Sequence, residues 1–367
     1  MIELTPSQRL LMGPGPSNVS YRVLRAMSTP LVGHLDPEFM AIMDQVCQML
    51  RHLFQTQNQM TFPVSGTGSA GLEAALVNLL EPGDTAVVCV HGVFGQRLTE
   101  VASRCGARVV NVEAPWGQPI DVQQLIETLQ KHPQAKLCAI VHAETSTGVL
   151  QPLEELGAYL KGQGTLLVVD TVTSLAGVPV KVDDWGIDVC YSGTQKCLSV
   201  PPGCAPITFS PKALEVVGKR KSKVQSWYLD VRLLQKYWGS ERLYHHTAPI
   251  TMIYGLYEGL RIILEEGLEA RFARHRELSA RLAQGLAGLG FTFLAKEGYR
   301  LPPLTSVFPP QAELVEPLRK KLLSDYGIEV GGGLGAYAGK IWRIGLMGET
   351  CRAQNIAILL DALGREL

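Results

Sequence analysis

The strongest constraint on the fold is an alternation of two sequence patterns between residues 60 and 210. Short apolar runs rich in β-branched residues alternate there with segments whose apolar residues recur at helical spacing. Strands of a parallel sheet read as continuous apolar runs, because helices cover both faces of the sheet. The pattern therefore predicts an α/β domain with a mostly parallel central sheet and helices on both faces. Its expected strands are residues 85–90, 107–112, 137–142, 165–170, 187–191 and 205–209.

The pattern changes beyond residue 250. Residues 251–289 form a long helical stretch rich in Leu, Ala, Arg and Glu, with Gly290 as its expected stop. Shorter strand and helix signals follow up to the last residue. We therefore expect a large domain over residues 20–250, a smaller C-terminal α+β domain over residues 251–367, and an N-terminal segment, residues 1–19, near the active site.

Composition restricts the class of partner. Of the 367 residues, 46% are hydrophobic and 19% are charged, whereas disordered chains combine low hydrophobicity with high net charge. The net charge of +0 supplies no overall field for a polyanion, which disfavours nucleic acid and anionic membranes and favours a small-molecule partner. No apolar run approaches the roughly 18 residues of a membrane span, and the first residues lack a signal-peptide pattern. A cytoplasmic globular protein is expected.

Cysteine and histidine residues indicate neither a disulfide framework nor a metal site. The 8 cysteines are scattered, form no CxxC pair and have mostly apolar neighbours, which indicates buried, reduced thiols. The adjacent His245 and His246 have no cysteine, histidine or carboxylate partner at ligand spacing. We therefore expect no bound metal.

Polar residues follow several of the expected strands, at the edge where open α/β sheets bind ligands. Residues 65–69 (Ser-Gly-Thr-Gly-Ser) precede a helix and would suit an anion, although a simple N-cap turn explains them nearly as well. Residues 143–148 form a hydroxyl-rich segment. Asp170 closes an apolar run and is either a turn cap or half of an ion pair. Lys196 lies among small polar residues after the 187–191 strand, where a lowered pKa would make it a Schiff-base candidate.

Together these residues match the chemistry of one cofactor. Pyridoxal 5′-phosphate (PLP) needs an anion site for its phosphate, a carboxylate beside its pyridine nitrogen and an amine for its aldehyde. The sequence offers residues 65–69, Asp170 and Lys196 in that order. Each signal is weak alone, but the ordered set predicts a PLP enzyme.

Segments along nearly the whole chain also match one known family. The chain resembles the class V aminotransferases of fold-type I, and within them the alanine–glyoxylate and serine–glyoxylate group. The resemblance implies the fold of PLP-dependent transferases and a transaminase activity. It rests on residues 13–18, 33–39, 65–69, 92–97, 144–148, 169–174, 192–196, 244–247 and 342–345.

The resemblance implies a role for each residue of the cofactor site. Lys196 would form the Schiff base with PLP and shuttle the proton between the substrate Cα and cofactor C4′. Asp170 would pair with the pyridinium nitrogen, Thr145 would lie near the ring hydroxyl, and Phe94 would stack on the ring. The residues expected to hold the phosphate are Thr67, Gly68, Ser69 and Gln195.

The resemblance also implies substrate and partner contacts. Arg343 would bind the substrate carboxylate, a role that suits a planar bidentate donor, although it could instead pair with a carboxylate between the domains. Gly15 would line the substrate site. Tyr244 and Thr247 would reach the phosphate in the neighbouring subunit, which implies a homodimer with shared active sites, although ordinary packing at a helix start is their alternative.

Two positions depart from the family pattern. Family members often carry tryptophan where this chain has Phe94, whose smaller face preserves stacking but lacks an N–H group. A histidine stands in the mammalian-type pattern where this chain has Ser69, whose hydroxyl can still donate to phosphate.

The predicted function is therefore a ping-pong transaminase. It would move an amino group from alanine or serine to glyoxylate, a 2-oxo acid, through a Lys196 Schiff base. The alternatives are a transaminase for another small donor such as an aminophosphonate, and a lyase of the cysteine desulfurase type. The lyase is disfavoured because Gln195 stands where a histidine is usual, and Cys197 directly follows the lysine. A non-catalytic PLP-binding protein is disfavoured because Lys196 and Asp170 are both present.

Overall fold

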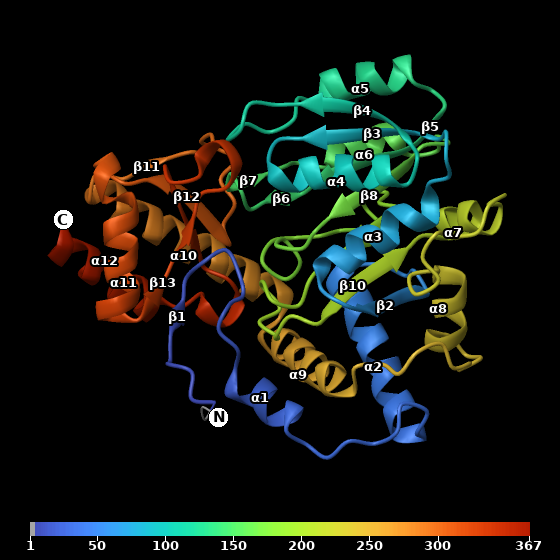
Figure 1. Ribbon diagram of the computed structural model, residues 1–367, viewed down its shortest axis with the longest axis horizontal. Helices are drawn as coiled ribbons and strands as arrows, with labels where there is room; N and C mark the ends of the chain where they lie inside the picture. Colours follow the sequence, from blue (N-terminus) through green and yellow to red (C-terminus); the bar gives the residue numbers. More distant parts are fainter. Residues whose placement is uncertain (1–3) are drawn as a thin grey trace.

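A seven-stranded sheet forms the centre of the larger unit of the computed structural model, which describes residues 4–367 (Figure 1). Its strand order is β2-β10-β9-β8-β5-β3-β4. Neighbouring strands from β9 to β4 pair in parallel, whereas β10 runs antiparallel to both β2 and β9. The prediction of a mostly parallel sheet is confirmed. The strands are β2 (Met60–Ser65), β3 (Thr85–Val90), β4 (Arg108–Glu113), β5 (Ala135–Val141), β8 (Leu166–Asp170), β9 (Val189–Tyr191) and β10 (Cys204–Phe209).

Helices cover both faces of this sheet, as predicted. α4 packs against β3 in front of the sheet and α6 packs against β8 behind it (Figure 1). The central strands are consequently buried on both faces, and every residue of β3 and β8 is buried. Within residues 4–367 no helix is both long and apolar enough to cross a bilayer. The helices of this unit are α1 (Tyr21–Met27), α2 (Pro37–Phe54), α3 (Gly68–Leu79), α4 (Val93–Arg104), α5 (Val122–Lys131), α6 (Glu154–Leu160), α7 (Pro211–Gly218), α8 (Val231–Trp238) and α9 (Ile250–Glu266).

The strand β2 was not among the expected strands, and its sequence contains a proline. Pro63 cannot donate a backbone hydrogen bond, which argues against a strand inside a sheet. In the structure β2 lies at the edge and has β10 as its neighbour, with Pro63 opposite Pro206. An edge strand tolerates proline because one side needs no partner. β2 matters for function because its carboxyl end leads into residues 65–69.

A smaller unit follows, with its own antiparallel sheet and hydrophobic core. The sheet order is β11-β12-β15-β14, and residues such as Trp342, Ile344 and Leu282 form a core separate from that of the large sheet. Trp342 donates its indole N–H to the carbonyl of Val315 at 2.7 Å. The elements are α10 (Leu268–Gly288), β11 (Thr292–Phe293), β12 (Leu304–Phe308), α11 (Val315–Tyr326), β13 (Ile328–Glu329), β14 (Gly331–Gly332), β15 (Trp342–Gly345) and α12 (Ala353–Glu366).

The helical stretch expected over residues 251–289 is divided into two helices. Gly267 has a φ of +82°, a left-handed conformation that suits glycine and interrupts α9 before α10 begins. α9 packs against α1 and α2, and its buried residues belong to the core of the large sheet. The domain boundary at residue 250 remains a prediction.

The N-terminal segment connects the two units. β1 (Leu10–Leu11) pairs in parallel with β13 of the smaller unit. Six residues beyond β1, Ser17 donates its hydroxyl to the carbonyl of Lys196 at 2.8 Å. Residues 12–17 therefore pass from the smaller unit to the turn that carries Lys196. Residues 1–3 of the expected N-terminal segment lie outside the described residues.

Candidate active site

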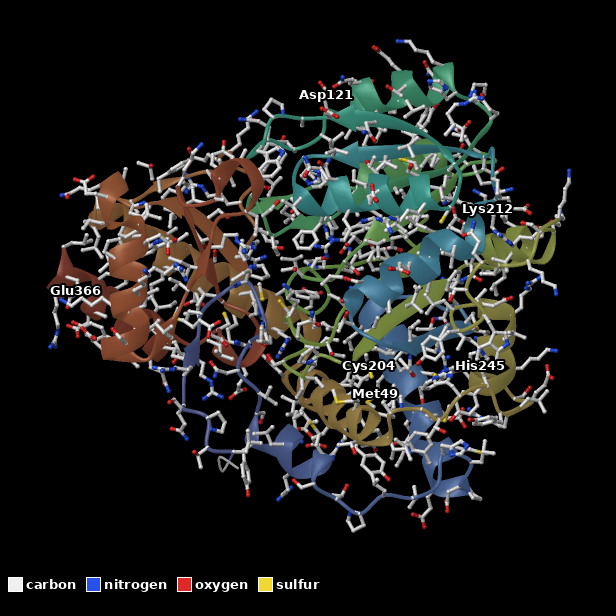
Figure 2. The ribbon with its side chains drawn as sticks, viewed as in Figure 1. Met49, Asp121, Cys204, Lys212, His245 and Glu366 are labelled. Carbon is white, nitrogen blue, oxygen red and sulfur yellow. The ribbon has the colours of Figure 1, made fainter. Side chains whose placement is uncertain are left out.

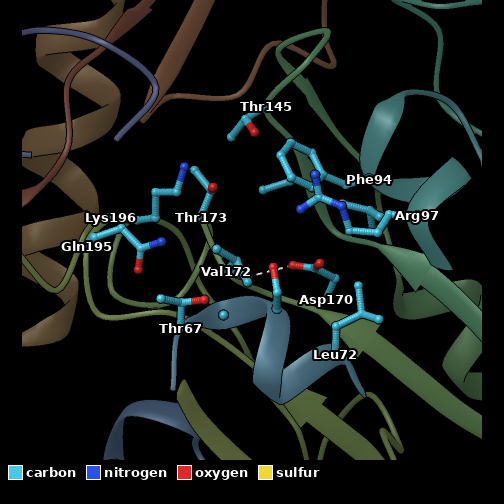
Figure 3. Close-up of a pocket in the computed structure, with 14 residues that line it drawn as sticks. Thr67, Leu72, Phe94, Arg97, Thr145, Asp170, Val172, Thr173, Gln195 and Lys196 are labelled. Atoms are coloured by element: carbon cyan, nitrogen blue, oxygen red, sulfur yellow. Dashed lines mark hydrogen bonds between the residues drawn. The ribbon is translucent and has the colours of Figure 1, made fainter. Parts of the chain in front are cut away.

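One cavity lies beyond the carboxyl ends of the parallel strands, where the sequence placed the ligand site (Figure 3). Figure 3 shows Lys196 on one side of this cavity and Asp170, Phe94 and Arg97 on the other. The parallel pairing explains the convergence, because strands that run in one direction end at one edge of the sheet. The cavity is lined by most of the candidate site residues, namely Thr67, Gly68, Ser69, Phe94, Thr145, Asp170, Gln195 and Lys196. Their individual roles remain predictions.

The start of α3 forms the polar floor of the cavity. Thr67 is the N-cap residue of α3, but its side chain makes no capping hydrogen bond. The first N–H groups of a helix have no partner within the helix, and their partial positive charge favours an anion. The side-chain Oε1 of Gln195, buried at the same cavity, has no hydrogen-bond partner within residues 4–367. The first N–H groups of α3 can bind a phosphate without any rearrangement of their own hydrogen bonds, whereas Gln195 would have to present its Nε2 amide, because Oε1 only accepts.

Asp170 ends β8 and is held by two hydrogen bonds. The backbone N–H of Val172 donates to Oδ1 at 2.9 Å, and the hydroxyl of Tyr191 donates to Oδ2 at 2.8 Å. Burial raises the pKa of Asp170, while these two donors and the nearby Lys196 act in the opposite direction. A fixed, buried carboxylate of this kind can stabilise a cation placed in the cavity.

Lys196 follows β9 and is only 8% exposed. Burial, with the charge of Arg343, lowers the pKa of Lys196 to about 8. Its amine therefore loses its proton closer to neutral pH than an exposed lysine does, as a nucleophile or a proton carrier requires. The Nζ atom donates to the carbonyl of Pro14. Gly15 is needed beside it, because a Cβ there would lie 2.6 Å from Cδ of Lys196.

The start of α4 brings an aromatic ring to the cavity. The ring belongs to Phe94, and the buried carboxylate of Glu144 holds it in place. Oε2 of Glu144 accepts from the N–H groups of Phe94 and Gly95 at 3.1 and 3.3 Å. Oε1 accepts from the N–H of Ser146 at 3.0 Å. Glu144 thus fixes the helix that carries Phe94 and the loop that carries Thr145 relative to each other.

Arg97 lines the cavity and was missed by the reasoning from sequence. Its guanidinium carbon lies 4.9 Å from the ring centroid of Phe94, in a cation–π contact. The signal was present, since residues three apart on a helix share a face and Phe94 was already a candidate. Thr173 and Val172 also line the cavity and were not singled out.

Arg343 lies on β15 and approaches the cavity from the smaller unit. Its Nε donates to the carbonyl of Gly332 at 2.7 Å, and Nη1 lies 3.5 Å from the carbonyl of Thr145. Within residues 4–367 no carboxylate lies within 4.0 Å of it, so the alternative of a direct ion pair between the units does not occur there. Burial lowers the pKa of Arg343 to about 10, against the opposing field of Glu144. It stays charged at neutral pH.

Tyr244 and Thr247 do not line this cavity. Tyr244 is 61% exposed, and Thr247 is also exposed. Both flank His245 and His246, which lie close to the end of β2. Contacts with a neighbouring subunit remain a prediction for these two residues.

Cys197 is unsuited to the lyase alternative. It is fully buried, and its thiol donates to the carbonyl of Thr173 at 3.2 Å. Burial raises the pKa of Cys197 to about 12, which disfavours the thiolate that a nucleophile requires. Within the part of the chain that the structure describes, no group of three or more His, Cys, Asp or Glu residues is arranged to hold a metal ion.

Comparison with known proteins identifies full-length relatives. A family model described as "Aminotransferase class-V" matches residues 16–357. The chain is 42% identical to the (S)-ureidoglycine–glyoxylate transaminase of Bacillus subtilis, with 98% of this chain and 91% of that protein covered. It is also 42% identical to the alanine–glyoxylate aminotransferase of Oryctolagus cuniculus, over 99% of this chain and 94% of the relative.

A solved structure shares the whole fold. The crystal structure of the alanine–glyoxylate aminotransferase of Nostoc sp. superimposes with a TM-score of 0.97. The two sequences are 47% identical, and the alignment covers 100% of this chain and 97% of the other. The likeness extends over the large sheet, the smaller unit and the segment that connects them.

Proposed function

Because this chain belongs to the class V aminotransferase family, we propose that it is a PLP-dependent transaminase that transfers an amino group from a small donor to glyoxylate. The observation that carries the proposal is the convergence of the α3 N-terminus, Asp170 and Lys196 on one cavity. The names of two full-length relatives, both glyoxylate transaminases, support glyoxylate as the acceptor.

The residues present fit PLP. The start of α3 lies at the cavity and leaves N–H donors that no capping side chain uses, and the side-chain amide of Gln195 lines the same cavity and can donate from its Nε2. Asp170 offers a carboxylate to a protonated ring nitrogen, and Lys196 offers an amine to an aldehyde. We therefore assign the phosphate to Thr67, Gly68, Ser69 and Gln195, the ring to Phe94 and Thr145, and the ring nitrogen to Asp170. When bound, PLP supplies an electron-withdrawing ring that stabilises negative charge at the substrate Cα.

Residues of the chain itself bind the substrate and transfer its proton. Arg343 binds the substrate carboxylate through a planar guanidinium that is already held by the carbonyl of Gly332. Lys196 moves the proton at the substrate Cα, and its lowered pKa of about 8 makes both protonation states accessible near neutral pH. Gly15 gives the lysine the space to do so.

The relatives are named for different amino donors. Alanine or serine was the donor expected from the sequence, whereas one relative is named for (S)-ureidoglycine. Alanine carries a methyl group where (S)-ureidoglycine carries a polar ureido group. A site built to hydrogen-bond a polar group rejects an analogue that lacks it, so the two donors should differ strongly in rate. We propose alanine or (S)-ureidoglycine as the donor.

Half-reactions test this proposal directly. Protein supplemented with PLP is expected to be yellow, to lose its visible absorbance on addition of the true donor, and to recover it when glyoxylate follows. Alanine, (S)-ureidoglycine, serine and glycine are added separately under single-turnover conditions, with absorbance followed in time. The proposed reaction would be refuted if no donor bleached the visible absorbance. It would also be refuted if glyoxylate did not restore the absorbance after bleaching.

We also propose a homodimer in which Tyr244 and Thr247 contact the phosphate in the partner's site. An exposed apolar surface beside them supports this, since Trp227 and Leu243 are 61% and 52% exposed. Sedimentation equilibrium is expected to give twice the chain mass of 40.0 kDa. Mixing inactive Lys196→Ala chains with inactive Tyr244→Ala chains should restore activity in part, because a mixed dimer keeps one site free of both substitutions. A monomer of full activity contradicts the shared site.

A further inference from the structure

A row of hydrogen bonds runs behind the start of α3 and is not part of the cavity. Oγ of Ser65, the last residue of β2, lies 2.7 Å from Nε2 of His246. Nδ1 of His246 lies 2.8 Å from Nδ1 of His245, and Nε2 of His245 lies 3.3 Å from the carbonyl oxygen of Trp227. Figure 2 shows His245 beside α8, away from the smaller unit.

The carbonyl at one end fixes the direction of every bond in this row. A carbonyl oxygen only accepts, so His245 carries its proton on Nε2. In the neutral ring Nδ1 of His245 is then an acceptor, and His246 must donate to it from its own Nδ1. That leaves Nε2 of His246 as an acceptor. The hydroxyl of Ser65 therefore donates to His246.

His246 is neutral around pH 7 in this arrangement. Burial, with the charges of His245 and His34, lowers the pKa of His246 to about 4. The other titratable groups that face the ring are Tyr228 and Tyr237, whose ring centroids lie 5.1 and 5.6 Å away. The rings pack edge-on and present no charge of their own. The ring of His246 therefore keeps one donor nitrogen and one acceptor nitrogen over the working range of pH.

The row is attached to the loop that the proposed function assigns to phosphate. Ser65 directly precedes Gly66, which has a φ of +151° and so occupies a conformation that glycine tolerates best. The N–H of Gly66 donates to the carbonyl of Gly203 at 3.0 Å. The loop is thus held at three neighbouring points, the Ser65 hydroxyl, the Gly66 amide and the Ser65 carbonyl, which accepts from the hydroxyl of Tyr228 at 3.3 Å. Beyond them the chain enters Thr67 and α3.

We infer that His246 is a positioning residue for phosphate, which acts by holding Ser65 and through it residues 67–69. The inference rests on the proposed function, because it takes the phosphate of PLP as the ligand of these residues. The inference also gives Ser65 a role that differs from that of the phosphate-binding residues. Since the hydroxyl of Ser65 donates to His246, it cannot donate that proton to phosphate, unlike the hydroxyls of Thr67 and Ser69.

Two substitutions at one position separate the two bonds of His246. A glutamine amide reaches the place of Nε2 and keeps the bond to Ser65, whereas an asparagine amide reaches only the place of Nδ1 and keeps the bond to His245. Affinity for PLP and for pyridoxal, which lacks the phosphate, is measured by titration of the apoprotein. His246→Asn is expected to weaken PLP binding about tenfold, equal to about 1.4 kcal/mol. His246→Gln should stay within about twofold of wild type, and pyridoxal affinity should be the same in all proteins.

Further variants control for folding and for general effects. Ser65→Ala removes the same bond from the other side, so it should match His246→Asn, and the double variant should show no additional loss. If His246→Asn does not fold, the PLP affinity of Ser65→Ala tests the inference in its place. His52→Gln changes an exposed histidine of α2 and should leave both affinities unchanged.

Several results would overturn the inference. Equal losses in the glutamine and asparagine variants would show that packing alone matters. A matching loss of pyridoxal affinity would show that phosphate is not the group affected, and additive effects in the double variant would separate Ser65 from His246. A wild type that binds PLP but shows no difference between the variants overturns this inference alone. A wild type that binds neither ligand overturns the proposed function with it.

Discussion

Replacement of Lys196 by alanine is expected to abolish transamination while the protein still folds and binds PLP. The amine is buried, its pKa is lowered to about 8, and it lies in the cavity together with Asp170. A group that moves the proton at the substrate Cα typically contributes about 10²- to 10⁴-fold, and Lys196 also supplies the amine that reacts with the aldehyde. We therefore expect a loss of at least about 10⁴-fold in kcat. The protein should lose the absorbance of the Lys196 Schiff base together with its activity.

The control is a lysine at the opposite edge of the same sheet. Lys212 donates to the carbonyl of Thr165 at 2.8 Å, before the start of β8, and Figure 2 shows it on α7 at the side away from the smaller unit. Lys212→Ala should keep both colour and rate. Absorbance spectra and steady-state rates of the two variants are compared at equal PLP saturation. A Lys196→Ala protein that retains wild-type turnover would exclude the lysine from the reaction.

Replacement of Asp170 by asparagine should leave PLP bound but remove most of the turnover. Asparagine keeps the size of the side chain and can still accept from the N–H of Val172. It lacks the negative charge that keeps a ring nitrogen protonated, and without that proton the ring withdraws electrons less strongly. Removal of one electrostatic contribution of this kind costs about 10²- to 10³-fold, and we expect roughly 10³-fold in kcat with a small change in KM.

Tyr191→Phe separates the charge of Asp170 from its orientation. The substitution removes the hydroxyl that donates to Oδ2 at 2.8 Å but leaves the carboxylate in place. The substitution should lower kcat about tenfold, which corresponds to the loss of one hydrogen bond to a charged group. If Asp170→Asn and Tyr191→Phe lowered kcat to the same extent, orientation rather than charge would explain the role of Asp170.

The sequence predicted the site best where a chemically suitable residue directly follows a strand of the parallel sheet. Asp170 and Lys196 each follow an apolar run, and parallel strands bring such positions to one edge whatever the details of packing. The expected and observed strands agree for this reason within about two residues, for example 85–90 and Thr85–Val90. The full-length match with class V aminotransferases confirms the family that the motifs indicated.

Other features depend on contacts that a linear pattern does not encode. Whether Pro63 is tolerated depends on the place of β2 at the sheet edge. Gly267 could stand inside a helix or end one, and its positive φ is set by how α9 and α10 pack on different cores. The bond between Ser65 and His246 joins residues 181 positions apart. No local periodicity predicts such a pair.

The parallel pairing of β1 with β13 has a consequence for the order in which the protein is made. Leu10 pairs with Ile328, so the second residue emerges from the ribosome more than 300 positions after the first. The large sheet ends at β10 and can assemble long before that point, since domains fold as units during synthesis. The N-terminal segment, which brings Pro14 and Gly15 against Lys196, must wait for its partner strand. A nascent chain therefore places Pro14 and Gly15 against Lys196, beside β13, only when about nine-tenths of its length has been translated.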